Sequence, residues 1–256
     1  MTDKKLQPIG IFDSGIGGLT VLKEAMKQLP HENFIYFSDS ANFPYGDKKN
    51  HELKKIIVKN IKILVEKGCK VVFIACNTAT SIAIDDLRKK YSIPIIGMEP
   101  AIKLALEGKH KKILVLATPI TLKLKKFNQL KTRLDKNNDL VILPAKGLAS
   151  LIEKDVLSGS NKKEIKKYLK KLFFQINQDE ISAVVLGCTH YIFIKDLIQS
   201  FFPGKKIIDG NRGTVYQLKK ILKDKNLLNK QKEKGRLIGN PPRRREEGKL
   251  CQINTK

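Results

Sequence analysis

Two cysteines occupy matching positions at the ends of two apolar segments. Cys76 follows the run Val71-Val72-Phe73-Ile74-Ala75, and Cys188 follows Ala183-Val184-Val185-Leu186-Gly187. Thiols with suitable pKa values act as bases or acids, and a thiolate is the reactive form. Two thiols on opposite sides of one carbon could remove a proton from one face and deliver a different proton to the other. The pair therefore predicts inversion of a carbon centre by proton transfer.

Polar residues beside the two cysteines could support this chemistry. Asn77, Thr78 and Thr189, with the backbone amides after each strand, could stabilise a carbanion through hydrogen bonds to a substrate carboxylate. Such a reaction needs no cofactor, and no cysteine pair has the spacing of a zinc site. Asp13 could bind an amine or assist proton transfer at Cys76. We expect His190, two residues after Cys188, to hold that thiol in the required protonation state.

The remaining cysteines and the N-terminus predict a cytoplasmic protein with reduced thiols. Cys69 precedes its apolar run and Cys251 lies near the C-terminus, so we expect both to be inert. The first residues contain no apolar segment of the kind found in signal peptides, and no run reaches membrane-spanning length. A disulfide between Cys76 and Cys188 is therefore disfavoured.

The chain is strongly basic, with 50 Lys and Arg against 25 Asp and Glu and a formal charge of +25. The lysines are spread along nearly every expected helix and loop and are not interleaved with aromatic residues. This distribution favours a solvated surface over a specific nucleic-acid interface. We therefore predict a small-molecule substrate, no specific nucleic-acid partner and no membrane partner, with nonspecific binding of polyanions as the remaining alternative.

Short apolar runs alternate with segments of helical period along the chain. The runs predict strands at residues 9–12, 34–37, 71–75, 95–96, 113–117, 140–143, 183–187 and 206–209. Helical periodicity predicts helices within 19–29, 53–64, 79–90, 122–134, 148–156, 162–176 and 192–201, and one after 210. This alternation predicts an α/β fold with two doubly wound parallel-sheet domains. Each domain would place one cysteine at the carboxyl end of a strand, facing a shared cleft.

Two loops between these elements could approach a ligand. Asp13-Ser14-Gly15-Ile16-Gly17-Gly18 allows a sharp turn before a helix whose N-terminal amides could hold a carboxylate or phosphate. The loop lacks the first glycine of the dinucleotide fingerprint and an acidic ribose reader, which disfavours nucleotide binding. Tyr45, between Pro44 and Gly46, could offer a backbone amide to a ligand.

Six motifs, taken together, resemble those of glutamate racemases, which belong to the family of cofactor-independent aspartate/glutamate racemases. They are Phe12-Asp13-Ser14-Gly15-Ile16-Gly17-Gly18, Pro44-Tyr45-Gly46, Ala75-Cys76-Asn77-Thr78-Ala79, Met98-Glu99-Pro100, Ala117-Thr118-Pro119-Ile120-Thr121 and Leu186-Gly187-Cys188-Thr189-His190-Tyr191. The resemblance covers residues 8 to 222. It implies interconversion of L- and D-glutamate for peptidoglycan synthesis and the cell wall, without a cofactor.

The resemblance also implies residue roles. Cys76 would handle the proton of the D-enantiomer and Cys188 that of the L-enantiomer, with Asp13 and His190 as further catalytic residues. Contacts to the substrate would come from Asp13, Ser14, Tyr45, Gly46, Asn77, Thr78, Thr189 and His190. The first domain would comprise residues 1–98 and 210–256, and the second residues 99–209. A homodimer is expected, and residues 239–256 are expected to form a disordered tail.

The chain departs from the family pattern in places that leave alternatives open. Leu143-Pro144-Ala145-Lys146-Gly147-Leu148 replaces a segment that usually contains Cys-Pro or bulkier apolar residues. A racemase for aspartate or another amino acid is one alternative. A non-catalytic binding module would not require the two thiols, and a cysteine hydrolase using Cys188 and His190 would leave Cys76 unexplained.

Overall fold

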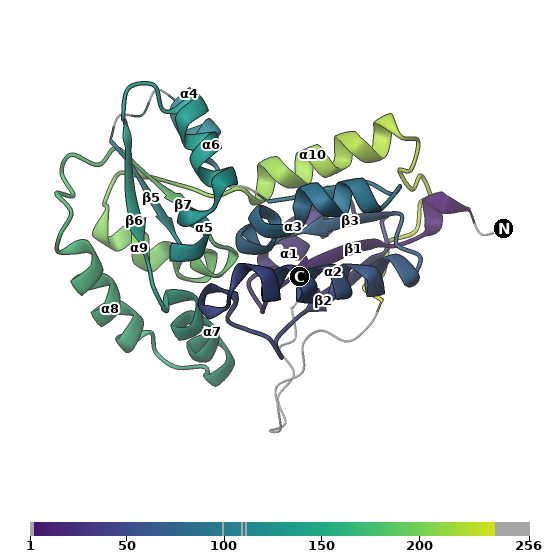
Figure 1. Cartoon of the computed structure of the whole chain (residues 1–256), viewed down its shortest axis with the longest axis horizontal. Coiled ribbons are helices and arrows are strands. Elements are labelled where there is room, and N and C mark those ends of the chain that lie inside the picture. The colour runs from purple at the N-terminus through teal and green to yellow at the C-terminus, as the bar shows by residue number, and fades with distance from the viewer. Residues whose placement is uncertain (1–2, 99, 109, 111, 239–256) are drawn as a thin grey trace.

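A computed structural model describes residues 3–238 apart from 99, 109 and 111. The described chain forms two lobes, each built on a parallel four-stranded sheet (Figure 1). This arrangement confirms the predicted α/β class with two domains. The precise domain limits stay a prediction, and the expected tail at 239–256 lies outside the described residues.

The first sheet has the strand order β2-β1-β3-β4. Its strands are β1 (Ile9–Asp13), β2 (Phe34–Ser38), β3 (Val71–Ile74) and β4 (Ile95–Gly97). Every residue of β1 and β3 is buried, as expected for central strands with helices on both faces. Burying each large aliphatic side chain contributes about 1.5–3 kcal/mol, so the strand that ends at Cys76 is firmly held.

The second sheet repeats this plan with the order β6-β5-β7-β8. Its strands are β5 (Ile113–Ala117), β6 (Leu140–Pro144), β7 (Ala183–Leu186) and β8 (Lys206–Ile208). β7 therefore holds the position that β3 holds in the first sheet. Since Cys76 follows β3 and Cys188 follows β7, the two cysteines stand at equivalent strand ends.

Helices cover both faces of each sheet and create four apolar clusters. On the first sheet, α1 (Leu19–Gln28) and α10 (Asn211–Asp224) pack on one face. α2 (Asn50–Glu66) and α3 (Asn77–Lys90) pack on the other. The second sheet is covered by the remaining helices, which are α4 (Ile102–Glu107), α5 (Pro119–Lys123), α6 (Lys125–Leu134), α7 (Leu148–Ser158), α8 (Lys163–Phe173) and α9 (Lys195–Phe201).

Two predicted helices are wrong in detail. The helix expected over 122–134 is two helices, because Leu124 has an extended backbone (φ −72°, ψ 143°) and separates α5 from α6. No glycine or proline marks this break, so the apolar period spans it. The helix expected over 192–201 begins as a 3-10 helix, η3 (Thr189–Ile194), and continues as α9. Tyr191 and Ile194, three residues apart, are both buried, which suits a three-residue turn.

The segment after α10 returns to the first sheet. Arg236 accepts a hydrogen bond through its carbonyl from the Phe34 amide, and the Ile238 amide donates to the Phe34 carbonyl. A buried ion pair fastens this segment, because the Lys70 ammonium contacts both the Glu32 carboxylate and the Leu227 carbonyl. Short 3-10 helices, η1 (Lys4–Leu6) and η2 (Tyr45–Asp47), complete the elements. Among the described helices, none is both long enough and apolar enough to cross a membrane.

Candidate active site

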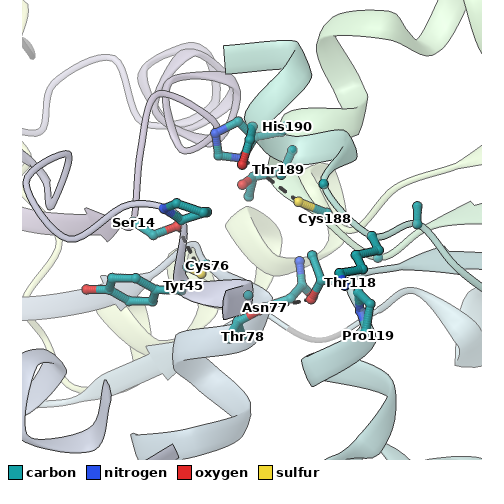
Figure 2. A pocket seen from close by; sticks show the side chains of 18 of the residues that line it. Ser14, Tyr45, Cys76, Asn77, Thr78, Thr118, Pro119, Cys188, Thr189 and His190 are labelled. Carbon is teal, nitrogen blue, oxygen red and sulfur yellow. Dashed lines mark hydrogen bonds between the residues drawn. The ribbon is translucent and has the colours of Figure 1, made fainter. Parts of the chain in front are cut away.

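Cys76 and Cys188 line the same cavity, about 220 Å³ in volume, between the two sheets. Figure 2 shows them on opposite sides of this space, Cys76 with Ser14 and Tyr45, and Cys188 with Thr189 and His190. The cavity lies where the carboxyl ends of β3 and β7 face each other, the usual ligand position in open parallel sheets. The structure therefore brings the two predicted thiols together.

Cys76 is surrounded by neutral hydrogen-bonding groups. Its Sγ is 3.5 Å from Ser14 Oγ and accepts a hydrogen bond from the Ala79 amide at 3.5 Å, capping α3. Only 7% of the residue is exposed. Burial, with the nearby charge of Asp13, raises the pKa of Cys76 to about 12, against the opposing effect of these two hydrogen bonds. At neutral pH this side chain is a thiol.

Cys188 has a charged neighbour instead. Its Sγ lies 3.9 Å from His190 Nδ1, and His190 Nε2 is 2.6 Å from Glu153 Oε2. Burial alone would lower the pKa of His190, but the hydrogen bonds to Cys188 and Glu153 outweigh it and raise the pKa to about 10. Below this pKa a protonated, positively charged imidazole lies beside the Cys188 Sγ.

Asp13 lies beneath the cavity and does not line it. Its carboxylate accepts from the Gly15 amide at 3.0 Å and from the Thr189 hydroxyl at 3.2 Å. The second contact joins the end of β1 to η3 in the other domain. Complete burial raises the pKa of Asp13 to about 6, although His190 and both hydrogen bonds act in the opposite direction.

The other residues predicted to contact a ligand do line the cavity; they are Ser14, Tyr45, Gly46, Asn77, Thr78, Thr189 and His190. The Tyr45 hydroxyl points away to donate to Asp39 at 2.6 Å, which leaves its backbone nearest the cavity. Asn77 Oδ1 is buried and has no hydrogen-bond partner within residues 3–238 as described. Because buried polar atoms are normally paired, this oxygen is available to a ligand donor.

Sequence reasoning did not name Glu153, Thr118 or Thr121 as site residues, although both threonines lie in a quoted motif. Glu153 is 7% exposed, and besides His190 it accepts from the Ile16 amide at 3.1 Å. Glu153 could have been recognised in the sequence as a carboxylate on the apolar face of a predicted helix, beside Ile152 and three residues before Val156. Thr78 Oγ1 lies 3.2 Å from Thr118 Oγ1 and 3.0 Å from Thr121 Oγ1, which links α3 to the second domain.

The glycine-rich loop contacts the second domain of the protein. A Cβ at Gly15 would collide with Glu153, and one at Gly17 would collide with Thr189 and His190. The loop amide of Ile16 holds a carboxylate, as the sequence suggested, but this carboxylate is the protein's own Glu153. The glycines therefore allow the two domains to approach closely around the cavity.

Cys69 lies apart from this site. It is a free, buried cysteine whose pKa is raised to about 12 by burial. Its side chain belongs to the apolar cluster under α2 and α3, in keeping with the expectation that it is inert. Cys251 falls outside the described residues. Within the described residues, no three His, Cys, Asp or Glu side chains converge as metal ligands would.

Comparison with known proteins places this arrangement in a family. The model of the Asp/Glu/Hydantoin racemase family matches residues 21–218. A glutamate racemase of Clostridium botulinum (strain Alaska E43) is 48% identical over 236 residues, 91% of this chain and 90% of the relative.

Solved structures agree with this match. The fold superimposes on glutamate racemase from Francisella tularensis with a TM-score of 0.79 and 31% identity, covering 93% of this chain and 90% of that one. Escherichia coli glutamate racemase superimposes with a TM-score of 0.77 and 28% identity, covering 85% of this chain and 83% of that one. Matches of this length at this identity show common descent as well as a common fold. The chain therefore belongs to the Asp/Glu/Hydantoin racemase family and is a racemase.

Proposed function

We propose that this chain interconverts L- and D-glutamate by a two-base reaction of Cys76 and Cys188. The observation that carries the proposal is that both thiols, from equivalent strand ends of the two domains, line one cavity. The names of the relatives support the choice of substrate. The Francisella tularensis structure is a complex with D-glutamate, and the Escherichia coli structure is a complex with L-glutamate.

The surroundings of the two thiols suggest their roles in the reaction. Burial raises the pKa of Cys76 and keeps it a thiol, so the scheme gives the role of base to Cys188, whose Sγ lies 3.9 Å from His190 Nδ1. In this state Cys188 takes the α-proton of L-glutamate, and Cys76 gives its proton to the opposite face of the carbanion. Once D-glutamate has formed, Cys76 is a thiolate and Cys188 is a thiol. The reverse reaction starts from that second state.

Groups around the cavity would bind the amino acid and stabilise the carbanion. The unpaired Oδ1 of Asn77 can accept from the α-ammonium group. Thr118 and the backbone amides at Tyr45, Gly46 and Thr189 can donate to carboxylate oxygens. Asp13 and Glu153 do not line the cavity and act through Thr189 and His190. These two carboxylates are positioning residues in this scheme.

The wider role follows from the same proposal. A glutamate racemase would supply D-glutamate for peptidoglycan in the cytoplasm. We further propose that the chain acts as a homodimer and needs no cofactor. We also propose domains of residues 1–98 plus 210–256 and of residues 99–209.

Isotope transfer in heavy water tests the two-base reaction. Product formed early should carry deuterium at the α-carbon, because its proton comes from a thiol that has exchanged with solvent. Unreacted substrate should stay protonated at that carbon. Mass spectrometry of each separated enantiomer gives both values. Retention of the original proton in the product would reject two bases in favour of one, and the same assay with aspartate tests the alternative substrate.

A further inference from the structure

Two lysines line the cavity in addition to the groups used above. Lys123 is the last residue of α5, and Lys146 lies in the loop between β6 and α7. Both are exposed although they line the cavity, which places them where it opens to solvent. Among the described residues, no carboxylate lines this cavity and neither ammonium group has an ion-pair partner. The opening is therefore cationic.

The backbone that carries Lys146 is held in place. The Tyr168 hydroxyl donates to the Lys146 carbonyl at 2.8 Å, and the Tyr191 hydroxyl donates to the Ala145 carbonyl at 3.4 Å. Gly147 follows with a left-handed backbone (φ 76°), a conformation that glycine adopts easily. These contacts direct one lysine to the cavity, while its four-carbon side chain can still follow a ligand inward.

We propose that Lys123 and Lys146 are specificity-determining residues that select acidic amino acids by charge. The inference rests on the proposed function and deepens it. The two ammonium groups attract the second carboxylate of the substrate as it enters, and they do not take part in proton transfer. A cleft lined by one sign of charge raises the rate at which an opposite charge enters, and added salt weakens this effect.

Binding of glutarate, an unreactive dicarboxylate, tests the proposal without depending on racemisation. The double variant Lys123→Gln with Lys146→Gln should bind glutarate about tenfold more weakly at low salt, equal to about 1.4 kcal/mol. The difference should shrink at high salt. In the racemisation assay, KM for glutamate should rise by a similar factor while kcat stays unchanged. Calorimetry measures the binding, and the melting temperature confirms that these exposed changes leave the fold intact.

The matched control is Lys125→Gln with Lys154→Gln. Lys125 and Lys154 are exposed, lie near the other pair in sequence and do not line the cavity. This control should bind glutarate within about twofold of the parent.

Three results would overturn the proposal. They are a loss of glutarate affinity below about threefold in the double variant, an equal loss of affinity in the control, or a fall in kcat with KM unchanged. If the parent racemises glutamate but glutarate binding is unchanged, only this inference fails. If the parent binds glutarate through these lysines but racemises nothing, only the proposed function fails.

Discussion

The ends of β3 and β7 use one backbone plan to create two different environments for a thiol. After β3, Cys76 caps an α-helix and meets a serine hydroxyl and a backbone amide. After β7, Cys188 directly precedes a 3-10 helix, and its Sγ faces the imidazole of His190. Thr78 and His190 occupy the same position relative to the two cysteines. The residue two positions along is therefore an uncharged threonine after β3 and an imidazole beside Sγ after β7.

This difference shows how a repeated fold can support a reaction that needs two unlike groups at once. A racemase with two thiols in the same resting state would have two acids or two bases. Burial without a cationic partner keeps Cys76 protonated, whereas Cys188 has the His190–Glu153 pair beside it. In the proposed reaction, the asymmetry of the neighbours supplies one acid and one base.

Removing either thiol should have the largest effect. In Cys76→Ala and Cys188→Ala we expect kcat/KM for racemisation to fall by about a thousandfold or more, since a missing acid is as damaging as a missing base. Polarimetry in both directions measures this loss. Proton exchange should separate the two sites, because Cys188 in the first variant can still exchange the α-proton of L-glutamate, and Cys76 in the second that of D-glutamate.

Cys69→Ala is the control for these variants, because Cys69 is a buried free thiol outside the cavity. It should racemise glutamate at a rate close to that of the parent. Activity within tenfold of the parent in either cavity variant would contradict the assignment of an acid and a base to the two strand ends.

The repeated strand ends could be predicted from the sequence, and the connection between domains could not. Five-residue runs followed by a cysteine are local patterns, and parallel pairing places each cysteine at the carboxyl edge of its own sheet. Glu153 connects the domains by accepting from the Ile16 amide, 137 residues away in sequence, and it reaches His190, 37 residues away, only through packing of α7 on η3. The sequence indicated this contact only weakly, because a single carboxylate on an apolar helix face does not identify the residue that it will bind.

The broken helices have a similar explanation. Leu124 fits the apolar period of its neighbours, and nothing in the local sequence marks the extended backbone that separates α5 from α6. The threonines that join α3 to α5 were within a quoted motif, but their mutual distances come from docking of the two domains. Local periodicity thus predicted which elements exist, and long-range packing decided where they end.

Glu153→Gln should change the pH dependence of the reaction. The glutamine cannot supply the negative charge that helps to keep His190 protonated, so the pKa of His190 should fall from about 10. Histidine is charged below its pKa, so the alkaline limb of kcat/KM should move to lower pH. We expect a roughly tenfold loss at about pH 8 and a smaller loss at about pH 6. Glu164→Gln, on the exposed part of α8, is the control. A uniform loss at all pH values would point to a purely structural role.

The smallest expected effect is a gain in stability from Asp13→Asn. Asp13 is fully buried with its pKa raised to about 6, so the folded state binds its proton more tightly than the unfolded state does. The stability of the parent should therefore fall as the pH rises from about 4 to 6, and the cost of the buried charge should persist above this range. Asparagine carries no charge and can still accept from the Gly15 amide, while its NH₂ group faces the Thr189 hydroxyl, which can accept. We expect the variant to be more stable than the parent by about 1–3 kcal/mol at pH 8, with the difference disappearing near pH 4. Thermal melts at several pH values measure this difference.

A variant less stable than the parent at pH 8 would show that the attraction between Asp13 and the imidazolium of His190 exceeds the cost of burying the carboxylate. The charged side of the cavity would then extend across the domain boundary to the end of β1.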